Sequence, residues 1–223
     1  MADMLWHGVS IVQAKGKIMF VDSLVELCLG IGYYVNNTTA GPGEISLLNS
    51  TFGLNSGGGI LISGNAKPVL VTKCFISNNR YAGIRLTGVG TAAICHNLIN
   101  FTQPRLSDGN FGDGIVAECS ENVIICQDNQ NFALDFLPPA IAYNARAGLS
   151  LLSSHAAVSN ALFQCNIFSL EAEDIEGSPC SHWSIDDLGG NQCSETRNGP
   201  CNSVICQVKS PGGPQPPEPI PPP

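Results

Sequence analysis

A repeat of about 24 residues constrains the fold of this chain more than any other feature. Two passes of it lie end to end between Gly59 and Asn100. Each pass has a glycine before an apolar run, then a turn of small residues, a second apolar run, and a third run that closes on asparagine. Ile60 and Ile84 hold the same place in the two passes and are 24 residues apart. A fixed period of this length is typical of a solenoid.

The pattern extends to both sides of the central pair. The opening glycines are separated by 24, 27, 24, 31 and 34 residues and are Gly8, Gly32, Gly59, Gly83, Gly114 and Gly148. The runs are short, bounded by turn residues and without helical periodicity, which is typical of strands. Three short strands per pass form one coil, and a coil buries its inner face only by stacking on its neighbours. The sequence therefore predicts an all-β parallel solenoid of about six coils over residues 8–168.

Composition supports a packed domain and excludes some partners. Of the 223 residues, 43% are hydrophobic and 13% charged, so a sizeable core is expected. The net charge of −8 argues against nucleic acid, whose phosphates need basic partners. The sequence contains no apolar run of 18 residues, so we expect no transmembrane segment. The expected division is a β-helix in residues 1–168, an irregular cysteine-rich segment in 169–209, and a proline-rich tail or linker in 210–223.

Ten cysteines raise the question of disulfides. Cys95 and Cys126 fall at the same offset in adjacent passes, so two stacked buried thiols are expected there, with a disulfide as the alternative. For the late cysteines, disulfides of an exported protein are favoured over a zinc site, because they contain no Cys-x-x-Cys pair; they are Cys180, Cys193, Cys201 and Cys206. We expect an extracellular or cell-surface location, although no signal peptide is visible.

The glycine-led Gly-Ile-x-Leu openings and asparagine-closed third runs resemble the right-handed parallel β-helix of the pectate-lyase-like superfamily. The resemblance covers about residues 8–168. It implies the fold and a set of functions that includes polysaccharide lyases, glycoside hydrolases, epimerases, phage tailspikes and adhesins. The chain lacks the Asn-Thr-Asp, Asp-Asp and Gly-His-Gly motifs of the polygalacturonase type, and Arg85 matches an Arg-Ile-Lys motif only superficially.

Alternation in the opening strands predicts two outward rows across the coils. The first row is Ser10, Tyr34, Leu61, Arg85, Val116 and Ser150, and the second is Val12, Asn36, Ser63, Thr87, Glu118 and Leu152. Together with the preceding loop, the rows offer four candidate catalytic residues, namely Asp108, Asp113, Glu118 and Arg85. The three carboxylates are also the candidate Ca²⁺ ligands of a lyase, and no other cofactor is expected. The alternative is that Asp108 and Asp113 are turn residues before glycine and that Glu118 is simply solvated.

Two function classes follow. The first is a non-catalytic β-helix module that is structural or binds carbohydrate or a surface. The second is a polysaccharide lyase or glycoside hydrolase that acts on cell-wall or extracellular polysaccharide. Polysaccharide is the candidate partner, with self-association or contact with a missing part of a longer chain as the alternatives, and whether the chain is an enzyme stays open.

The second strands predict an apolar outer face, because their apolar runs are unbroken. We assign Met19, Leu70, Ile94 and Ile125 to this face. Its expected cover is the segment from Leu170 onward, a second copy, or a missing part of a longer chain.

Overall fold

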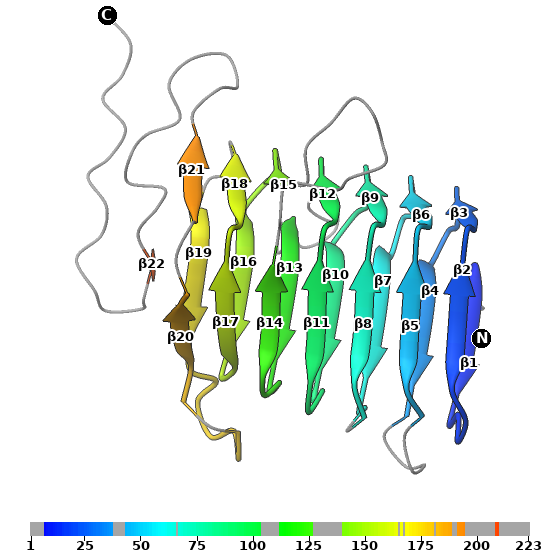
Figure 1. Ribbon diagram of the computed structural model, residues 1–223, viewed down its shortest axis with the longest axis horizontal. Helices are drawn as coiled ribbons and strands as arrows, with labels where there is room; N and C mark the ends of the chain where they lie inside the picture. The colour runs from blue at the N-terminus through cyan, green and yellow to red at the C-terminus, as the bar shows by residue number, and fades with distance from the viewer. Residues whose placement is uncertain are drawn as a thin grey trace, which may run out of the picture.

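The computed structural model describes residues 7–37, 43–65, 67–103, 112–126, 140–164, 166, 168–180, 182–188, 191–194 and 208–209. Every regular element in these ranges is a β-strand, and the strands stack into three parallel sheets (Figure 1). No helix of the described residues is long and apolar enough to cross a membrane. The parallel solenoid predicted from the repeat is confirmed.

Sheet 1 is built from the first strand of each coil and contains β1 (Val9–Val12), β4 (Ile31–Asn36), β7 (Gly58–Ser63), β10 (Ala82–Thr87), β13 (Asp113–Glu118), β16 (Ala147–Leu152), β19 (Phe168–Glu173) and β22 (Val208–Lys209). Sheet 2 contains β2 (Ile18–Val21), β5 (Ile45–Leu48), β8 (Val69–Thr72), β11 (Ala92–Cys95), β14 (Val123–Cys126), β17 (His155–Ser159) and β20 (Ser184–Asp187). Sheet 3 contains β3 (Leu24–Glu26), β6 (Thr51–Gly53), β9 (Phe75–Ser77), β12 (Leu98–Asn100), β15 (Ala140–Ala142), β18 (Leu162–Gln164) and β21 (Gln192–Ser194).

The register of sheet 1 follows the sequence repeat. Ile84 of β10 pairs with Ile60 of β7 on one side and with Ile115 of β13 on the other. The glycine before each of these positions is needed because neighbouring backbones come close there. A Cβ on Gly83 would lie 2.6 Å from the carbonyl oxygen of Gly114. The glycine-led openings of the repeat therefore report tight packing between coils.

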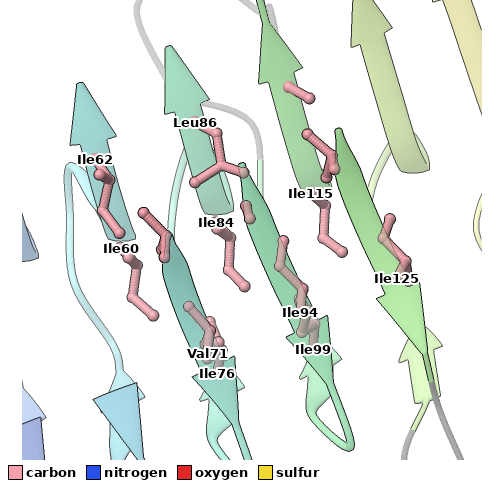
Figure 2. Packing of buried hydrophobic residues seen from close by; sticks show 14 of the residues in the cluster. Ile60, Ile62, Val71, Ile76, Ile84, Leu86, Ile94, Ile99, Ile115 and Ile125 are labelled. Atoms are coloured by element: carbon pink, nitrogen blue, oxygen red, sulfur yellow. The ribbon is translucent and has the colours of Figure 1, made fainter. Parts of the chain in front are cut away.

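The core fills the space between the three sheets. Inward aliphatic side chains from successive coils lie in rows along the solenoid axis (Figure 2). Ile84, Ile94 and Ile99 come from the three strands of one coil, and all three are fully buried. Each coil therefore contributes one layer of a continuous core.

Asparagine side chains stack at the turn between sheet 3 and sheet 1. The Asn55 amide nitrogen donates to Asn79 Oδ1 at 3.0 Å, and the Asn79 amide nitrogen donates to the carbonyl of Phe52 at 2.9 Å. Asn144 and Asn166 form the same contact three coils further on, at 2.9 Å. These bonds satisfy backbone groups of buried turns, which would otherwise be left without partners.

Sheet 2 corrects one prediction. Ile94 pairs with Val71, and Ile125 pairs with Ile94, so Ile94 and Ile125 point inward with Val71 and are fully buried. Met19 and Leu70 do face outward as predicted. The outward residues that replace the two isoleucines in the row are Ala93 and Ile124. An unbroken apolar run does not fix which residues face the core.

The sheets continue beyond residue 168, where the glycine-led openings end. β19 pairs with β16, β20 with β17 and β21 with β18. Residues 168–173 therefore extend sheet 1 and do not cover sheet 2. The proline-rich stretch 210–223, Cys201 and Cys206 lie outside the described residues.

Candidate functional site

The outer face of sheet 1 carries two of the four residues that the sequence singled out, Arg85 and Glu118. The strand register aligns both predicted outward rows, from Ser10 to Ser150 and from Val12 to Leu152. β19 adds Glu171 to the first row and Glu173 to the second. The face changes along its length, because Leu61 and Arg85 are partly exposed whereas Val116 and Ser150 are fully buried.

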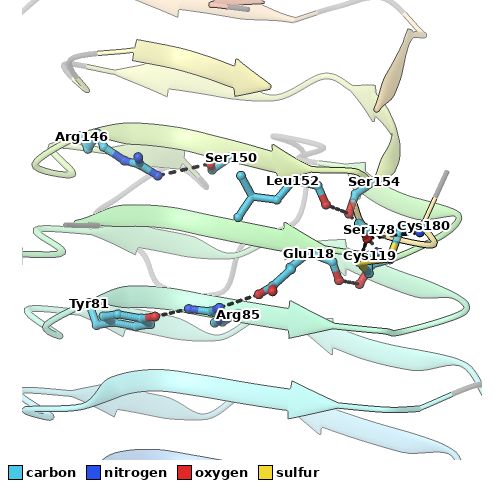
Figure 3. Close-up of polar contacts among 11 residues, drawn as sticks. Tyr81, Arg85, Glu118, Cys119, Arg146, Ser150, Leu152, Ser154, Ser178 and Cys180 are labelled. Atoms are coloured by element: carbon cyan, nitrogen blue, oxygen red, sulfur yellow. Dashed lines mark hydrogen bonds and ion pairs between the residues drawn. A yellow bond between two sulfur atoms is a disulfide. The ribbon is translucent and has the colours of Figure 1, made fainter. Parts of the chain in front are cut away.

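Arg85, Glu118 and Tyr81 form a polar cluster at the middle of this face (Figure 3). Arg85 lies in β10 and Glu118 ends β13, and the Arg85 guanidinium makes an ion pair with the Glu118 carboxylate. Arg85 also donates to the Tyr81 hydroxyl, and its guanidinium carbon lies 5.2 Å from the centre of the Tyr81 ring. The structure therefore brings two of the four predicted site residues together, as an ion pair across adjacent strands.

Asp113 forms a second ion pair at the start of β13. Its side chain is fully buried and accepts from Arg146 Nε at 2.8 Å, from Arg146 Nη2 at 2.5 Å and from the Ala147 N–H at 2.9 Å. Burial raises the pKa of Asp113, and the Arg146 guanidinium acts against this by favouring the carboxylate. Arg146 also lies 3.5 Å from Glu171 and donates to Ser150 at 3.3 Å. These contacts tie β13 to the next two coils.

Sequence reasoning missed the partner of Asp113, although a signal was present. Asp113 stands in the row of Ala82 and one residue before a coil-opening glycine, where other coils have Gly58 or Ala147. A carboxylate in a position otherwise held by small buried residues needs a cation nearby. Asp113 is thus a strand residue in a buried pair, which differs from both the turn residue and the exposed ligand that the sequence suggested.

The predicted carboxylates do not converge on one point. Asp113 and Glu118 are the first and last residues of β13, so their Cα atoms lie about 16 Å apart at the usual strand rise. The carboxyl groups of glycosidases lie about 5–10 Å apart, and ligands of one Ca²⁺ lie closer still. The described residues contain no cluster of three or more metal-ligating side chains. Asp108 lies outside the described residues.

The described residues contain two disulfides with both partners identified, one in sheet 2 and one next to Glu118. Cys95 and Cys126 are joined across β11 and β14, so the expected pair of free thiols is corrected to a disulfide. Cys119 directly follows Glu118 and is joined to Cys180, close to Ser178 (Figure 3). Cys193 is also disulfide-bonded. Disulfides are compatible with an extracellular protein.

A family model described as "Right handed beta helix region" matches residues 2–135. This range contains the first four complete coils and the Arg85–Glu118 pair. No curated protein and no solved structure matches the chain.

Proposed function

Because the chain belongs to the right-handed β-helix family, we propose that it is a non-catalytic binding module that holds polysaccharide on the outer face of sheet 1. The observation that carries this proposal is the pairing of its charges. Glu118 is engaged by Arg85, and Asp113 is buried against Arg146. Such pairs provide fixed hydrogen-bonding groups but no separate acid and base for bond cleavage.

The rest of the face has the chemistry of a sugar-binding surface. Tyr34 and Tyr81 add aromatic rings, and Asn36, Ser63 and Thr87 add polar groups in one row. Aromatic rings pack against the apolar faces of ligands, while a few fixed polar groups set their orientation. The rows repeat at the strand spacing of about 4.8 Å. A linear polymer that lies along the second row meets a polar side chain in each of four successive coils, from Asn36 to Glu118.

Net charge favours a neutral polysaccharide. The chain carries −8 overall, and an acidic polymer would be repelled by this field. Arg85 is the cation of the central cluster, and its charge is already balanced by Glu118. Hydroxyl groups, which both donate and accept, suit a matched pair of a guanidinium and a carboxylate.

The alternative is a glycoside hydrolase, and one observation keeps it in view. Glu118 and Glu173 stand in the same outward row, with Leu152 between them. Two strand spacings separate them by about 9.6 Å, which is at the upper end of the range for inverting enzymes. The ion pair of Glu118 with Arg85 argues against this role, because one of the two carboxylates is then already engaged.

Isothermal titration calorimetry with the full chain tests the proposal. Neutral and acidic polysaccharides are titrated with and without Ca²⁺, and released sugar is measured in parallel. We expect binding to a neutral polymer, no product, and an affinity at least about tenfold lower for Arg85→Ala, which removes a charge-assisted contact. Thr72→Ala, in the preceding coil on the outer face of sheet 2, is the matched control and leaves binding unchanged.

Two results contradict the proposal. Turnover that disappears in Glu118→Ala and in Glu173→Ala establishes the hydrolase. Equal affinity of the wild type, Arg85→Ala and Thr72→Ala for every polymer removes the face as a binding site.

A further inference from the structure

The Cys95–Cys126 disulfide joins two neighbouring coils on the outer face of sheet 2. Each cysteine is the last residue of its strand, β11 or β14, and the two hold paired positions in the ladder (Figure 1). The preceding Ile94 and Ile125 point into the core, so both cysteine side chains point outward. Both cysteines are partly exposed. The bond is therefore within reach of small molecules in the surrounding medium.

Backbone pairing holds the two strands together without this bond. β11 and β14 pair along their whole length, from Ala92 and Val123 to the two cysteines. Hydrogen bonds continue past the cysteines, where the His96 N–H donates to the Cys126 carbonyl at 2.9 Å. β8 and β17 pair with the two strands on their other sides. Both the disulfide and the dithiol are therefore compatible with the same folded sheet.

The spacing of parallel strands favours opening of the bond. Side chains at paired positions of parallel strands project in the same direction, so their Cβ atoms stay about one strand spacing apart, roughly 4.8 Å. The Cβ atoms of a disulfide lie about 3.8 Å apart. Closing the bond therefore pulls the ladder together at this point, and a disulfide that works against its surroundings is more easily reduced. Two thiols fit the ordinary spacing of the strands.

Short hydroxyl side chains flank the two ends of the bond. Thiol–disulfide exchange proceeds by attack of a thiolate on one sulfur, in line with the sulfur that leaves. Because the bond joins two coils, this line runs along the outward row to which both cysteines belong. Thr72 is the neighbour of Cys95 in this row, and Ser159 is the neighbour of Cys126. Both are partly exposed, so a short side chain borders the approach to either sulfur.

We propose that Cys95–Cys126 is a thiol–disulfide exchange site for small thiols of the glutathione type. The thiolate of one small thiol attacks either sulfur along the row, which forms a mixed disulfide and releases the other cysteine as a thiolate. A second small thiol attacks the mixed disulfide, releases the remaining cysteine and leaves as the oxidised small-molecule disulfide. The protein gains two electrons and two protons from the two thiols. The oxidised small molecule reverses the cycle, and sheet 2 stays folded throughout.

The disulfide next to Glu118 provides a comparison within the same molecule. Cys119 follows β13, and Cys180 lies between β19 and β20, so neither cysteine belongs to a strand. The spacing of paired strands does not oppose this bond, and the bond ties the segment after β19 to the rest of the chain. We therefore expect the bond between Cys95 and Cys126 to open first.

Equilibration of the full chain with mixtures of reduced and oxidised glutathione tests the proposal. Acid quenching, differential alkylation and mass spectrometry then measure each bond separately. We expect Cys95–Cys126 to be half reduced at a ratio of squared reduced glutathione to oxidised glutathione at least about tenfold lower than Cys119–Cys180 requires. Circular dichroism at that ratio should match the spectrum of the oxidised protein. Reduction of the two bonds at the same ratio, or loss of the strand signal when Cys95–Cys126 opens, overturns the proposal.

Bulk at the two ends of the bond tests the path of attack. Thr72→Leu with Ser159→Leu should slow reduction at least about tenfold and keep the ratio for half reduction, because blocked access changes the rate and not the equilibrium. Ser46→Leu with Ala157→Leu is the matched control, since both residues stand in the other outward row of sheet 2. The control keeps the wild-type rate. A wild-type rate in the blocked variant, or equal slowing in both variants, also overturns the proposal.

Discussion

The Tyr33 hydroxyl is the clearest single group whose presence costs stability. Tyr33 is fully buried, packs against Phe20 and Phe52, and its hydroxyl has no hydrogen-bond partner among the described residues. A buried polar group without a partner costs about 1–3 kcal/mol. Tyr33→Phe keeps the ring and removes this cost, so we expect a higher free energy of unfolding by up to that amount, measured by urea denaturation.

The matched control for this variant is Tyr34→Phe. The Tyr34 hydroxyl accepts from Asn36 Nδ2 at 3.2 Å on the outer face, so its loss leaves stability unchanged or slightly lower. A decrease in stability for Tyr33→Phe would contradict the account of the buried hydroxyl.

Alkaline pH gives an independent test of the same group. Burial raises the pKa of Tyr33 to about 12 from its ordinary value of 10.0. The unfolded chain therefore releases this proton first, and stability falls as the pH rises from about 10 to about 12. Tyr33→Phe removes this part of the decrease, which denaturation curves at pH 9 and pH 11 detect.

The candidate site was predictable at this scale wherever strand alternation applies. The outward position of Arg85 and Glu118 followed from counting along their strands, and the coil register brings the two side chains together. The Asp113–Arg146 pair was not found, because the two residues are separated by a long stretch of sequence with its own loop. A contact across such a distance depends on how many residues leave the repeat, which the period does not specify.

At the level of elements, the asparagine stack holds the turns between sheets 3 and 1. Asn79 is fully buried; it accepts from Asn55 and donates to the Phe52 carbonyl. Asn79→Ala leaves these buried groups without partners, and we expect a loss of about 3 kcal/mol in the free energy of unfolding.

The neighbouring Asn78→Gly is the control for this loss. Asn78 is exposed and has a φ of 55°, a conformation that glycine adopts without strain. The free energy of unfolding of Asn78→Gly should stay close to that of the wild type in the same urea titration. Equal losses in the two variants would show that the turn itself, and not the stack, carries the energy.

Strand existence was easier to predict than strand orientation. The alternation of β7 and β10 separates inward Ile60 and Ile84 from outward Leu61 and Arg85. In β14 no such contrast exists, since Val123, Ile124 and Ile125 are all apolar. Which of them faces the core depends on where the preceding turn ends, and this was the source of the error at Ile94 and Ile125.

At the scale of the whole molecule, the period predicted the architecture because each coil packs on its neighbours alone. The repeat did not predict the strands past residue 168, because β19 has no opening glycine. β19 nevertheless pairs with β16. Parallel strands therefore pair there without a glycine at the start of the coil. The C-terminal coils therefore depend on other contacts, and the Cys119–Cys180 disulfide links the segment after β19 covalently to the end of β13.

Reduction of this disulfide should uncouple the C-terminal strands from the rest. Cys119 follows β13, and Cys180 lies between β19 and β20, so the bond closes a loop over 61 residues of sequence separation. A loop of this length gives about 4 kcal/mol in the chain-entropy account. In a stack of coils whose energy is shared only between neighbours, that loss falls on the strands nearest the bond.

Hydrogen exchange of the wild type and of Cys119→Ser measures this effect. We expect the amides of β19, β20 and β21 to exchange faster in the variant, while those of β7 and β10 keep their protection. Cys95→Ser with Cys126→Ser is the control, because that bond joins two strands already paired in sheet 2, and it should leave β19 to β21 unchanged. Uniform loss of protection in Cys119→Ser would mean that the coils unfold as one unit, because local coupling alone would have left the distant strands protected.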